Sequence, residues 1–332
     1  MASFSFRVRT MRRCFLHIVD MRKWLLPAFV SLVLILLLLS PERYFLSVQG
    51  AVLLFASSVL PSMLPYFFFT KLLTATGCVG ALTATVGKPL GRAYKLSPVV
   101  AYPFLMSLLS GYPVGARVLS DLYQKGLIDR DDALHAASFT STSGSMFVLG
   151  SVGAVILKDI PAAVVILVSH YLGAFLNGFL YRGKRAGHTL PMLVFPESES
   201  LLSDAMYESV LSLAAVGGFI AVANLVGDMV LDLLSLCGIG RFLEDSVGGA
   251  LLYSLFEVTR GCVEFGALGM GRIRTAALCC LAVSFGGLSV LLQSLAFLGK
   301  TGLKAPKYLL MKTTQAALSF ALCVGLGFLF LR

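Results

Sequence analysis

The sequence has few charged residues and few residues of the kinds that build metal sites or soluble active sites. Only 13% of its 332 residues are charged and only four are histidine. Its seven cysteines form no CxxC pair and its histidines are scattered, which argues against a zinc site or a disulfide framework. We therefore expect no metal, no cofactor and no catalytic residues, with the cysteines serving as small buried hydrophobic residues.

Nucleotide-binding and nucleic-acid-binding patterns are also missing. There is no Walker motif, and the GxG at 269–271 follows no predicted strand, so it is not a dinucleotide fingerprint. The net charge of +10 comes from Lys and Arg residues at the ends of apolar segments, not from one basic stripe with aromatics. These absences argue against an enzyme, a nucleic-acid partner and an ATP-driven pump.

Long hydrophobic runs dominate the sequence. Hydrophobic residues make up 57% of the chain and the mean hydropathy is +0.86. Runs such as Leu32 to Leu39 do not alternate as the strands of an outer-membrane barrel do. Stretches of about 20 apolar residues predict an all-α polytopic protein of the cell membrane, whose first partner is the lipid bilayer. We expect such segments at 24–40, 46–71, 96–116, 134–157, 159–181, 207–236, 247–270, 273–299 and 306–331.

The N-terminal residues 1–23 precede the first of these segments. They carry six Lys or Arg residues and one Asp, which places them in the cytoplasm. Cleavage as a signal peptide near Gly50 is the alternative, but a long basic region followed by a whole membrane protein favours a retained anchor. We therefore expect 24–40 to be the first transmembrane helix.

The charged joints between segments predict the topology. Three joints rich in Lys and Arg should be cytoplasmic, and three joints without a positive excess should lie on the far side. These assignments require the segments 96–116 and 247–270 each to enter and leave on one side, as re-entrant hairpins. Arg272 and Arg274 then fall on the far side, against the charge rule. The cytoplasmic joints are Lys71 with Lys88, Arg92 and Lys95; Arg182 with Lys184 and Arg185; and Lys300 with Lys304 and Lys307.

With two hairpins, the chain divides into two copies of the order helix, hairpin, helix, helix. Repeat 1 spans 46–185, a cytoplasmic linker spans 186–206, and repeat 2 spans 207–332. The copies begin on opposite sides, so the prediction is an inverted repeat with broken helices, a recurrent plan of secondary transporters.

The first polar interruption that could carry function is SGYPVGAR. Glycines on either side of a proline break a helix, and exposed backbone at membrane depth is tolerated only when it is buried in protein or lines water. The half-helix beginning near Pro113 would present free N–H groups to an anion; a plain surface turn is the alternative. The candidate binding residues are Ser110, Gly111, Tyr112, Pro113, Gly115 and Arg117.

The second interruption is a run of hydroxyls within an apolar stretch. Such a run can line a polar path or coordinate a small cation, although Ser and Thr also serve close helix packing. The candidate binding residues are Thr140, Ser141, Thr142, Ser143 and Gly144.

The third interruption places charges inside an apolar segment. Glu257, Arg260 and Glu264 share one helical face, so the arginine can neutralise a glutamate on either side. Charges at this depth are costly and usually functional, and a stripe that only fixes helix packing is the alternative. Glu257, Arg260 and the neighbouring Thr259 are candidate binding residues.

The fourth interruption occupies the position in repeat 2 that the hydroxyl run occupies in repeat 1. Its paired glycines permit unwinding or close approach. The candidate binding residues are Gly286, Gly287, Ser289 and Gln293. Other polar residues within spans, including His170, Asn177 and Lys312, are expected to be hydrogen-bond partners between helices.

The motifs SGYPVGAR, SFTSTSGSMFVLGSVG, HYLGAFLNG, LFEVTRG and FGGLSVLLQS resemble the YlbJ family of sporulation integral membrane proteins, within the nucleoside-recognition or Gate domain superfamily. The resemblance covers nearly the whole chain from about residue 50. The chain departs from the family pattern at Thr142 and Ser145, where the family favours Asn and Pro, which leaves the ligand there open.

The resemblance implies a protein of the membrane around the forespore that supports dipicolinate delivery. Dipicolinate is a planar dianion that half-helix N-termini with Arg117 or Arg260 could meet. We therefore expect a transporter of a small polar or anionic solute, with dipicolinate as the substrate that the resemblance implies. A nucleoside or other metabolite symporter and a non-transporting assembly protein are the alternatives, and a homo-oligomer is left open.

Overall fold

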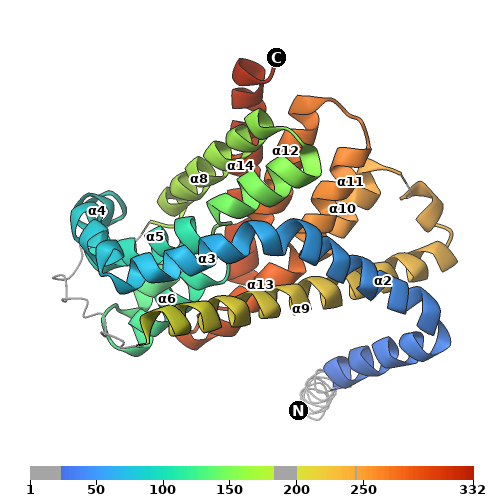
Figure 1. The fold of residues 1–332 in the computed structure, drawn as a ribbon, viewed down its shortest axis with the longest axis horizontal. Helices are drawn as coiled ribbons and strands as arrows, with labels where there is room; N and C mark the ends of the chain where they lie inside the picture. The colour runs from blue at the N-terminus through green and yellow to red at the C-terminus, as the bar shows by residue number, and fades with distance from the viewer. Residues whose placement is uncertain (1–23, 183–199, 244) are drawn as a thin grey trace, which may run out of the picture.

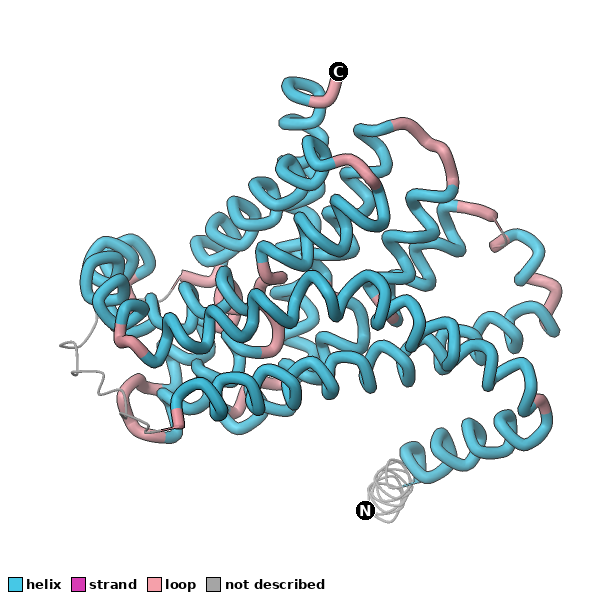
Figure 2. The backbone as a smooth tube through the Cα atoms, viewed as in Figure 1, coloured by secondary structure: helices cyan, strands magenta, loops and turns pink. Residues whose placement is uncertain are grey.

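The computed structural model describes residues 24–182, 200–243 and 245–332, and these residues form helices joined by loops, without a strand (Figure 2). The all-helical fold class predicted from the sequence is thereby confirmed. The predictions for residues 1–23, and for all but the last part of the linker, concern residues outside these ranges.

Five helical runs are long and apolar enough to cross a bilayer, since about 20 residues span its 30 Å hydrocarbon core. The chain is therefore a multi-pass membrane protein. The first run joins α2 (Pro41–Leu54), a π-helical turn (Phe55–Val59) and α3 (Leu60–Ala75). The others are α8 (Ile160–Leu180), α9 (Leu201–Leu236), α12 with α13 (Arg272–Phe285 and Gly287–Leu298), and α14 (Ala305–Phe330). A shorter apolar helix, Trp24–Leu39, precedes them.

Two pairs of short helices occupy the positions predicted for hairpins. They are α5 (Ala101–Ser110) with α6 (Val114–Gln124), and α10 (Val247–Phe256) with α11 (Val258–Ala267). Each helix is about 15 Å long at 1.5 Å per residue, half of a bilayer core. Gly115 lies against Ser107, and Gly261 lies against Ser254, so each pair folds back on itself. Two folded-back helix pairs are therefore present, although α6 extends to Gln124, past the predicted end at 116. Their re-entrant orientation in a bilayer stays a prediction, as does the inverted repeat.

A helix that the sequence analysis did not predict, α4 (Cys78–Tyr94), lies in what was expected to be a basic joint. Its backbone approaches the short 3-10 turn Pro98–Val100, because Gly87 and Gly91 both lie against Pro98. The charges of Lys88 and Arg92 favoured a loop. The contact of α4 with Pro98 is tertiary, and the local sequence does not show it. The π-helical segment Phe147–Leu157, preceded by α7 (Arg130–Ala136), completes the first half.

The long helices pack in two groups. The run α2–α3 lies beside α9, while α8, α12 and α14 pack together (Figure 1). The outer stripe of α8 is apolar and exposed, with Val164, Val168, Leu172 and Leu176 each more than 40% exposed. Its inner face instead carries buried polar residues. Apolar residues outside and polar residues inside are what lipid surroundings require.

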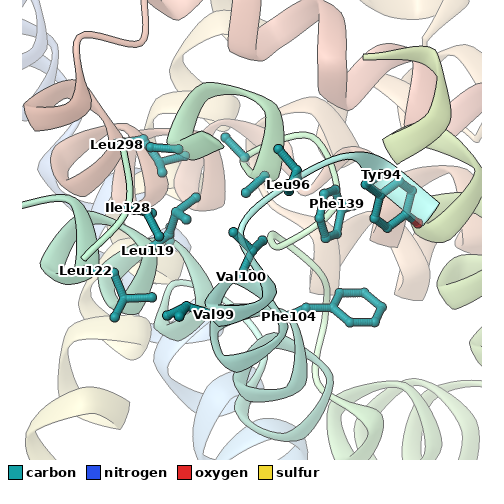
Figure 3. Packing of buried hydrophobic residues seen from close by; sticks show 14 of the residues in the cluster. Tyr94, Leu96, Val99, Val100, Phe104, Leu119, Leu122, Ile128, Phe139 and Leu298 are labelled. Atoms are coloured by element: carbon teal, nitrogen blue, oxygen red, sulfur yellow. The ribbon is translucent and has the colours of Figure 1, made fainter. Parts of the chain in front are cut away.

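One end of the molecule is filled by a hydrophobic cluster built on α4, α5, α6, the 3-10 turn after α4, and the end of α13. Figure 3 shows the rings of Tyr94 and Phe139 against each other, and their centroids are 4.5 Å apart. Leu119 and Leu298 close the other end of the cluster. We call this set the packed cluster. Among the cysteines, Cys262, Cys279, Cys280 and Cys323 are buried as expected, whereas Cys78 and Cys237 are exposed.

Candidate functional site

All four predicted interruptions meet at one cavity inside the molecule. The cavity has a volume of about 50 Å³. Tyr112 comes from the first interruption, Glu257 and Thr259 come from the third, and the remaining polar lining comes from the second and fourth. The polar lining residues are Tyr112, Ser143, Gly144, Glu257, Thr259, Ser289 and Gln293. Apolar side chains of the α2–α3 run and of α9, including Val59, Met63, Val216 and Ile220, close the cavity.

The first and second interruptions touch through their backbones. Gly111 has φ +71°, and a side chain there would run into the backbone nitrogen of Gly144. A side chain on Gly115 would likewise run into the carbonyl oxygen of Thr140. Only glycine satisfies both the left-handed angle and the contact at Gly111. The glycines of the first motif therefore place the hydroxyl-rich segment beside the cavity.

The hydroxyl-rich segment is unwound between α7 and the helix that begins at Ser145. Most of its polar groups fix the segment in place and do not face the cavity. The Ser141 hydroxyl lies 2.7 Å from the Tyr308 hydroxyl, and Thr142 Oγ1 donates to Ser107 Oγ over 3.0 Å. Only Ser143 and Gly144 of this segment line the cavity. The polar break lies where the sequence predicted it. Its hydroxyls differ in role, because those of Ser141 and Thr142 bond to neighbouring helices, whereas Ser143 lines the cavity.

His170 of α8 joins the second and fourth interruptions. It is fully buried, its Nε2 accepts the backbone N–H of Ser143 over 2.9 Å, and its Nδ1 lies 2.7 Å from Ser284 Oγ. An Nε2 that accepts an N–H bears no proton, so the ring is the neutral tautomer with its proton on Nδ1, directed at Ser284. The sequence analysis named His170 only as a general hydrogen-bond partner.

At the third interruption, Glu257 is extended and caps the N-terminus of α11. Its carboxylate accepts the backbone N–H of Arg260 over 2.8 Å and the hydroxyl of Thr259 over 3.0 Å. It is 3% exposed. A carboxylate at this position is stabilised by the free N–H groups and by the helix dipole. Among the described residues that line the cavity, Glu257 is the one with a charged side chain.

The expected neutralisation of Glu257 by Arg260 is wrong. The Arg260 guanidinium turns away, binds both oxygens of Asp228 over 2.9 and 3.0 Å, and stacks 3.8 Å above the Tyr253 ring. Glu264 is a weaker partner at 3.5 Å. The helical spacing could not show this, because Glu257 lies at the helix boundary and its partner is the backbone. Asp228 of α9 is therefore the main ion-pair partner of Arg260.

At the fourth interruption, α12 ends and α13 begins at two glycines with φ +93° and +63°. A side chain on Gly287 would lie 3.0 Å from the Ser254 carbonyl oxygen and 3.2 Å from that of Phe256. The fourth interruption therefore touches the third, as the second touches the first. Tyr112 joins the two halves, because its hydroxyl donates to the Val283 carbonyl over 2.6 Å.

Several predicted binding residues lie away from the cavity. Arg117 is exposed on α6, and Arg260 faces Asp228, so neither guanidinium reaches the cavity lining. The other predicted residues that do not line the cavity are Ser110, Gly111, Pro113, Gly115, Thr140, Ser141, Thr142, Gly286 and Gly287.

A charged vestibule lies beside the third interruption. Two polar cavities of about 600 and 480 Å³ share Arg43, Tyr253 and Glu264 in their linings. Arg43 pairs there with Asp232. Asn224 and Arg260 line the vestibule, and Ile220 and Glu257, one turn away on the same helices, line the central cavity. A single helical turn thus separates the vestibule from the candidate site.

Comparison with known proteins identifies one curated relative. The chain is 25% identical over 310 residues to a protein described as sporulation integral membrane protein YlbJ, from Bacillus subtilis (strain 168). The match covers 83% of this chain and 75% of that protein. No family model and no solved structure matches. The similarity agrees with the resemblance seen in the motifs and with an integral membrane location, while membership of the Gate domain superfamily stays a prediction.

Proposed function

We propose that this protein is a YlbJ-type membrane transporter that carries a small polar or anionic solute during sporulation, in the membrane that surrounds the forespore. The observation that carries the proposal is the convergence of four helix interruptions on one cavity, whose mostly apolar lining contains the carboxylate of Glu257. Interrupted helices free backbone groups at the bilayer midplane, where secondary transporters hold their substrates. Four interruptions at one point are difficult to explain by helix packing alone, because each sacrifices helical hydrogen bonds.

The surroundings of the cavity support alternating access. On one side a single helical turn separates it from the charged vestibule. On the opposite side the packed cluster fills the space between α4, α5 and α6. The cavity is thus nearly open toward the vestibule and closed toward the packed cluster. Transport requires a second conformation in which the cavity opens toward the packed cluster and closes toward the vestibule. The hairpins α5–α6 and α10–α11 are the elements we expect to move.

Dipicolinate is the substrate we propose first, on the basis of the similarity to the sporulation protein. The helix beginning at Ser145 and α13 both start at the cavity, where Gly144 and Ser289 line it. Two helix N-termini favour a carboxylate by their free N–H groups and dipoles. A cavity of about 50 Å³ holds only a few waters, at about 10–15 Å³ each. The binding of a planar dianion therefore requires the cavity to widen.

A nucleoside or another neutral metabolite is the second candidate, and the charge of the cavity favours it. Glu257 would repel a dianion unless a proton or a cation accompanies the substrate. Gln293, Thr259 and Ser289 offer neutral hydrogen-bonding groups such as a ribose would need. A non-transporting assembly protein is the alternative in which the polar groups only fix helix packing.

Uptake by the purified full chain in liposomes separates these functions. Labelled dipicolinate, a set of nucleosides and inorganic ions are offered in turn. Uptake of dipicolinate supports the first candidate, and uptake of nucleosides alone supports the second. Folded protein that moves none of them refutes transport and favours the assembly role.

The Glu257→Gln variant tests the cavity itself. It removes the charge and keeps the shape, so we expect uptake to fall at least tenfold while protein levels stay within about twofold. Glu42→Gln is the matched control, because Glu42 is exposed near the start of α2. Equal uptake by both variants would show that the cavity is not the substrate path.

A further inference from the structure

Lys312 is a buried cation that the proposed transport site does not yet explain. It lies on α14, is 1% exposed, and is among the largest fully buried side chains. Among the ion pairs of the described residues, none includes Lys312. A buried ammonium without a carboxylate is costly, and within a membrane protein such a residue usually serves a function.

The partners of Lys312 resemble those of a bound monovalent cation. Its Nζ donates to the Ser141 carbonyl oxygen over 2.9 Å and to Gln315 Oε1 over 2.7 Å. It also lies 5.2 Å from the centre of the Tyr112 ring, within range of a cation–π contact. Ser141 belongs to the unwound segment, and carbonyl oxygens of unwound segments are where transporters hold their coupling ions.

The same contacts tie Lys312 to the central cavity. Tyr112 lines the cavity, and its ring lies within cation–π range of the ammonium group. Ser141 is two residues before Ser143, which also lines the cavity. Gln315 Nε2 and Thr140 Oγ1 are buried and have no hydrogen-bond partner among the described residues. A change at Lys312 can therefore reach the unwound segment directly, and polar groups are present there to accept new bonds.

Among the residues that the structure describes, those that surround Lys312 do not include an acid that could fix its charge. α14 packs against α8, α12 and α13. α8 presents His170, and α13 carries polar but no charged residues. Tyr171 of α8 and Cys280 of α12 lie near Tyr112, which contacts the ammonium group. The α5–α6 connection presents Tyr112, and α14 itself presents Tyr308. His170 is neutral in this arrangement, because its Nε2 accepts the Ser143 N–H.

We propose that Lys312 is the proton-binding site that couples transport to the proton gradient, and this inference rests on the proposed function. Protonated, Lys312 donates to Ser141 and Gln315 and ties the unwound segment to α14. When the proton leaves, the neutral amine has one N–H fewer and no charge to hold the carbonyl, and the segment is released. The Lys312 ammonium group thus holds the unwound segment through a carbonyl oxygen, as a bound coupling ion does in other carriers.

The test uses the full chain in liposomes with the membrane potential clamped at zero and labelled dipicolinate as the probe. Two measurements are made: exchange without a pH gradient, and accumulation with one. For wild type we expect accumulation of about tenfold per pH unit if one proton moves with each solute, because one unit is a tenfold ratio of proton activity. For Lys312→Met we expect exchange to remain and accumulation to vanish.

Two further variants keep the test decisive. Lys312→Arg keeps the cation but cannot release its proton, so it should also lose accumulation. Lys307→Met, on the exposed face of the same helix, should behave as wild type. Accumulation by Lys312→Met or Lys312→Arg equal to that of wild type would overturn the proposal.

A measurement without transport distinguishes failure of this inference from failure of the proposed function. The Tm of the purified protein is followed against pH for wild type, Lys312→Met and Lys307→Met. If Lys312 titrates in the folded protein, the difference in Tm between wild type and Lys312→Met must change with pH. A difference that is constant at every pH shows a purely structural lysine, even if no solute is found.

Discussion

The two short hairpins occupy matching positions in the chain but are held by different physics. The α5–α6 connection is fixed by backbone contact, since Gly111 lies directly against Gly144. The α10–α11 connection is fixed by charge, since Glu257 caps α11 and Arg260 binds Asp228 of α9. Steric contact is insensitive to its solvent, whereas an ion pair depends on its hydration. The hairpin beside the vestibule is therefore the one that can respond to ligand, proton or salt.

The largest effect is expected at the steric hairpin. Gly111→Ala adds a side chain where φ is +71° and where Gly144 leaves no space. Gly111 also has ψ −161°, a region that only glycine adopts readily. This strain costs about 1–3 kcal/mol, and the clash adds to it, so we expect a loss of stability above about 3 kcal/mol. Expression level and the Tm of purified protein measure it.

Gly126→Ala is the control, because Gly126 has φ +69° and open space around it. It should cost only the strain, about 1–2 kcal/mol. Equal losses at the two glycines would show that contact between the interruptions contributes nothing.

The next effect is expected at the charged hairpin. Asp228→Asn leaves the Arg260 guanidinium half-buried with only Glu264 at 3.5 Å. We expect a loss of about 1–3 kcal/mol, smaller than for a fully buried pair because both side chains keep some exposure. Thermal unfolding at low and high salt checks it, and salt should reduce the difference between the variants.

A double-mutant cycle sharpens this result. Arg260→Met combined with Asp228→Asn should cost less than the sum of the single losses, because neither charge is then left unpaired. Additive losses would show that the pair does not hold α11 to α9, and the comparison of the hairpins would fail.

His170 connects the two halves and should have an intermediate effect. His170→Phe leaves the buried N–H of Ser143 without its acceptor, which costs about 1–3 kcal/mol. His170→Gln offers an amide oxygen to that N–H and should recover part of the loss. Melting temperatures of the two variants, compared with wild type, decide this, and no recovery would mean that ring packing is what matters.

The smallest effect is expected outside the hairpins, at the exposed ion pair of Arg272 with Asp159. Arg272 Nε donates to Asp159 over 2.7 Å, and this bond lowers the pKa of the Asp159 carboxyl below its ordinary value. Arg272→Ala should lower the Tm less than any of the variants above, because the arginine is half exposed and solvent screens the pair.

The pH dependence of this pair has a definite sign. A carboxyl whose pKa is lower in the folded protein adds stability above its ordinary pKa of 3.8 and loses it as the pH falls through the lower value. The stability difference between wild type and Arg272→Ala should therefore shrink in acid. A difference that grows in acid would contradict the assignment.

The sequence predicted the positions of the polar interruptions well, because a polar or glycine-rich break in an apolar run is a local feature. Tyr112, Ser143, Glu257 and Gln293 were all predicted and all line one cavity. The partners of charged residues were predicted poorly. Helical spacing paired Arg260 with Glu257 or Glu264, whereas in the structure it binds Asp228, 32 residues away.

The surroundings of Lys312 were likewise not predictable from the sequence. The sequence showed that Lys312 lies within a span, but the absence of an acid near it among the described residues depends on the packing of α8, α12 and α13 around it. α4 was missed for a related reason, since its basic residues indicated a joint and only its contact with Pro98 fixes it as a helix.

By itself the sequence determined that the chain is helical and lies in a membrane, because apolar runs of about 20 residues have no other stable solution in water or lipid. It also determined where the helices break, because glycine and proline act on their own backbone. Only the tertiary structure decided that the four breaks share one cavity, that Arg260 turns away from it, and that Lys312 is buried beside it. Those are contacts between residues far apart in the chain, and local spacing carries no information about them.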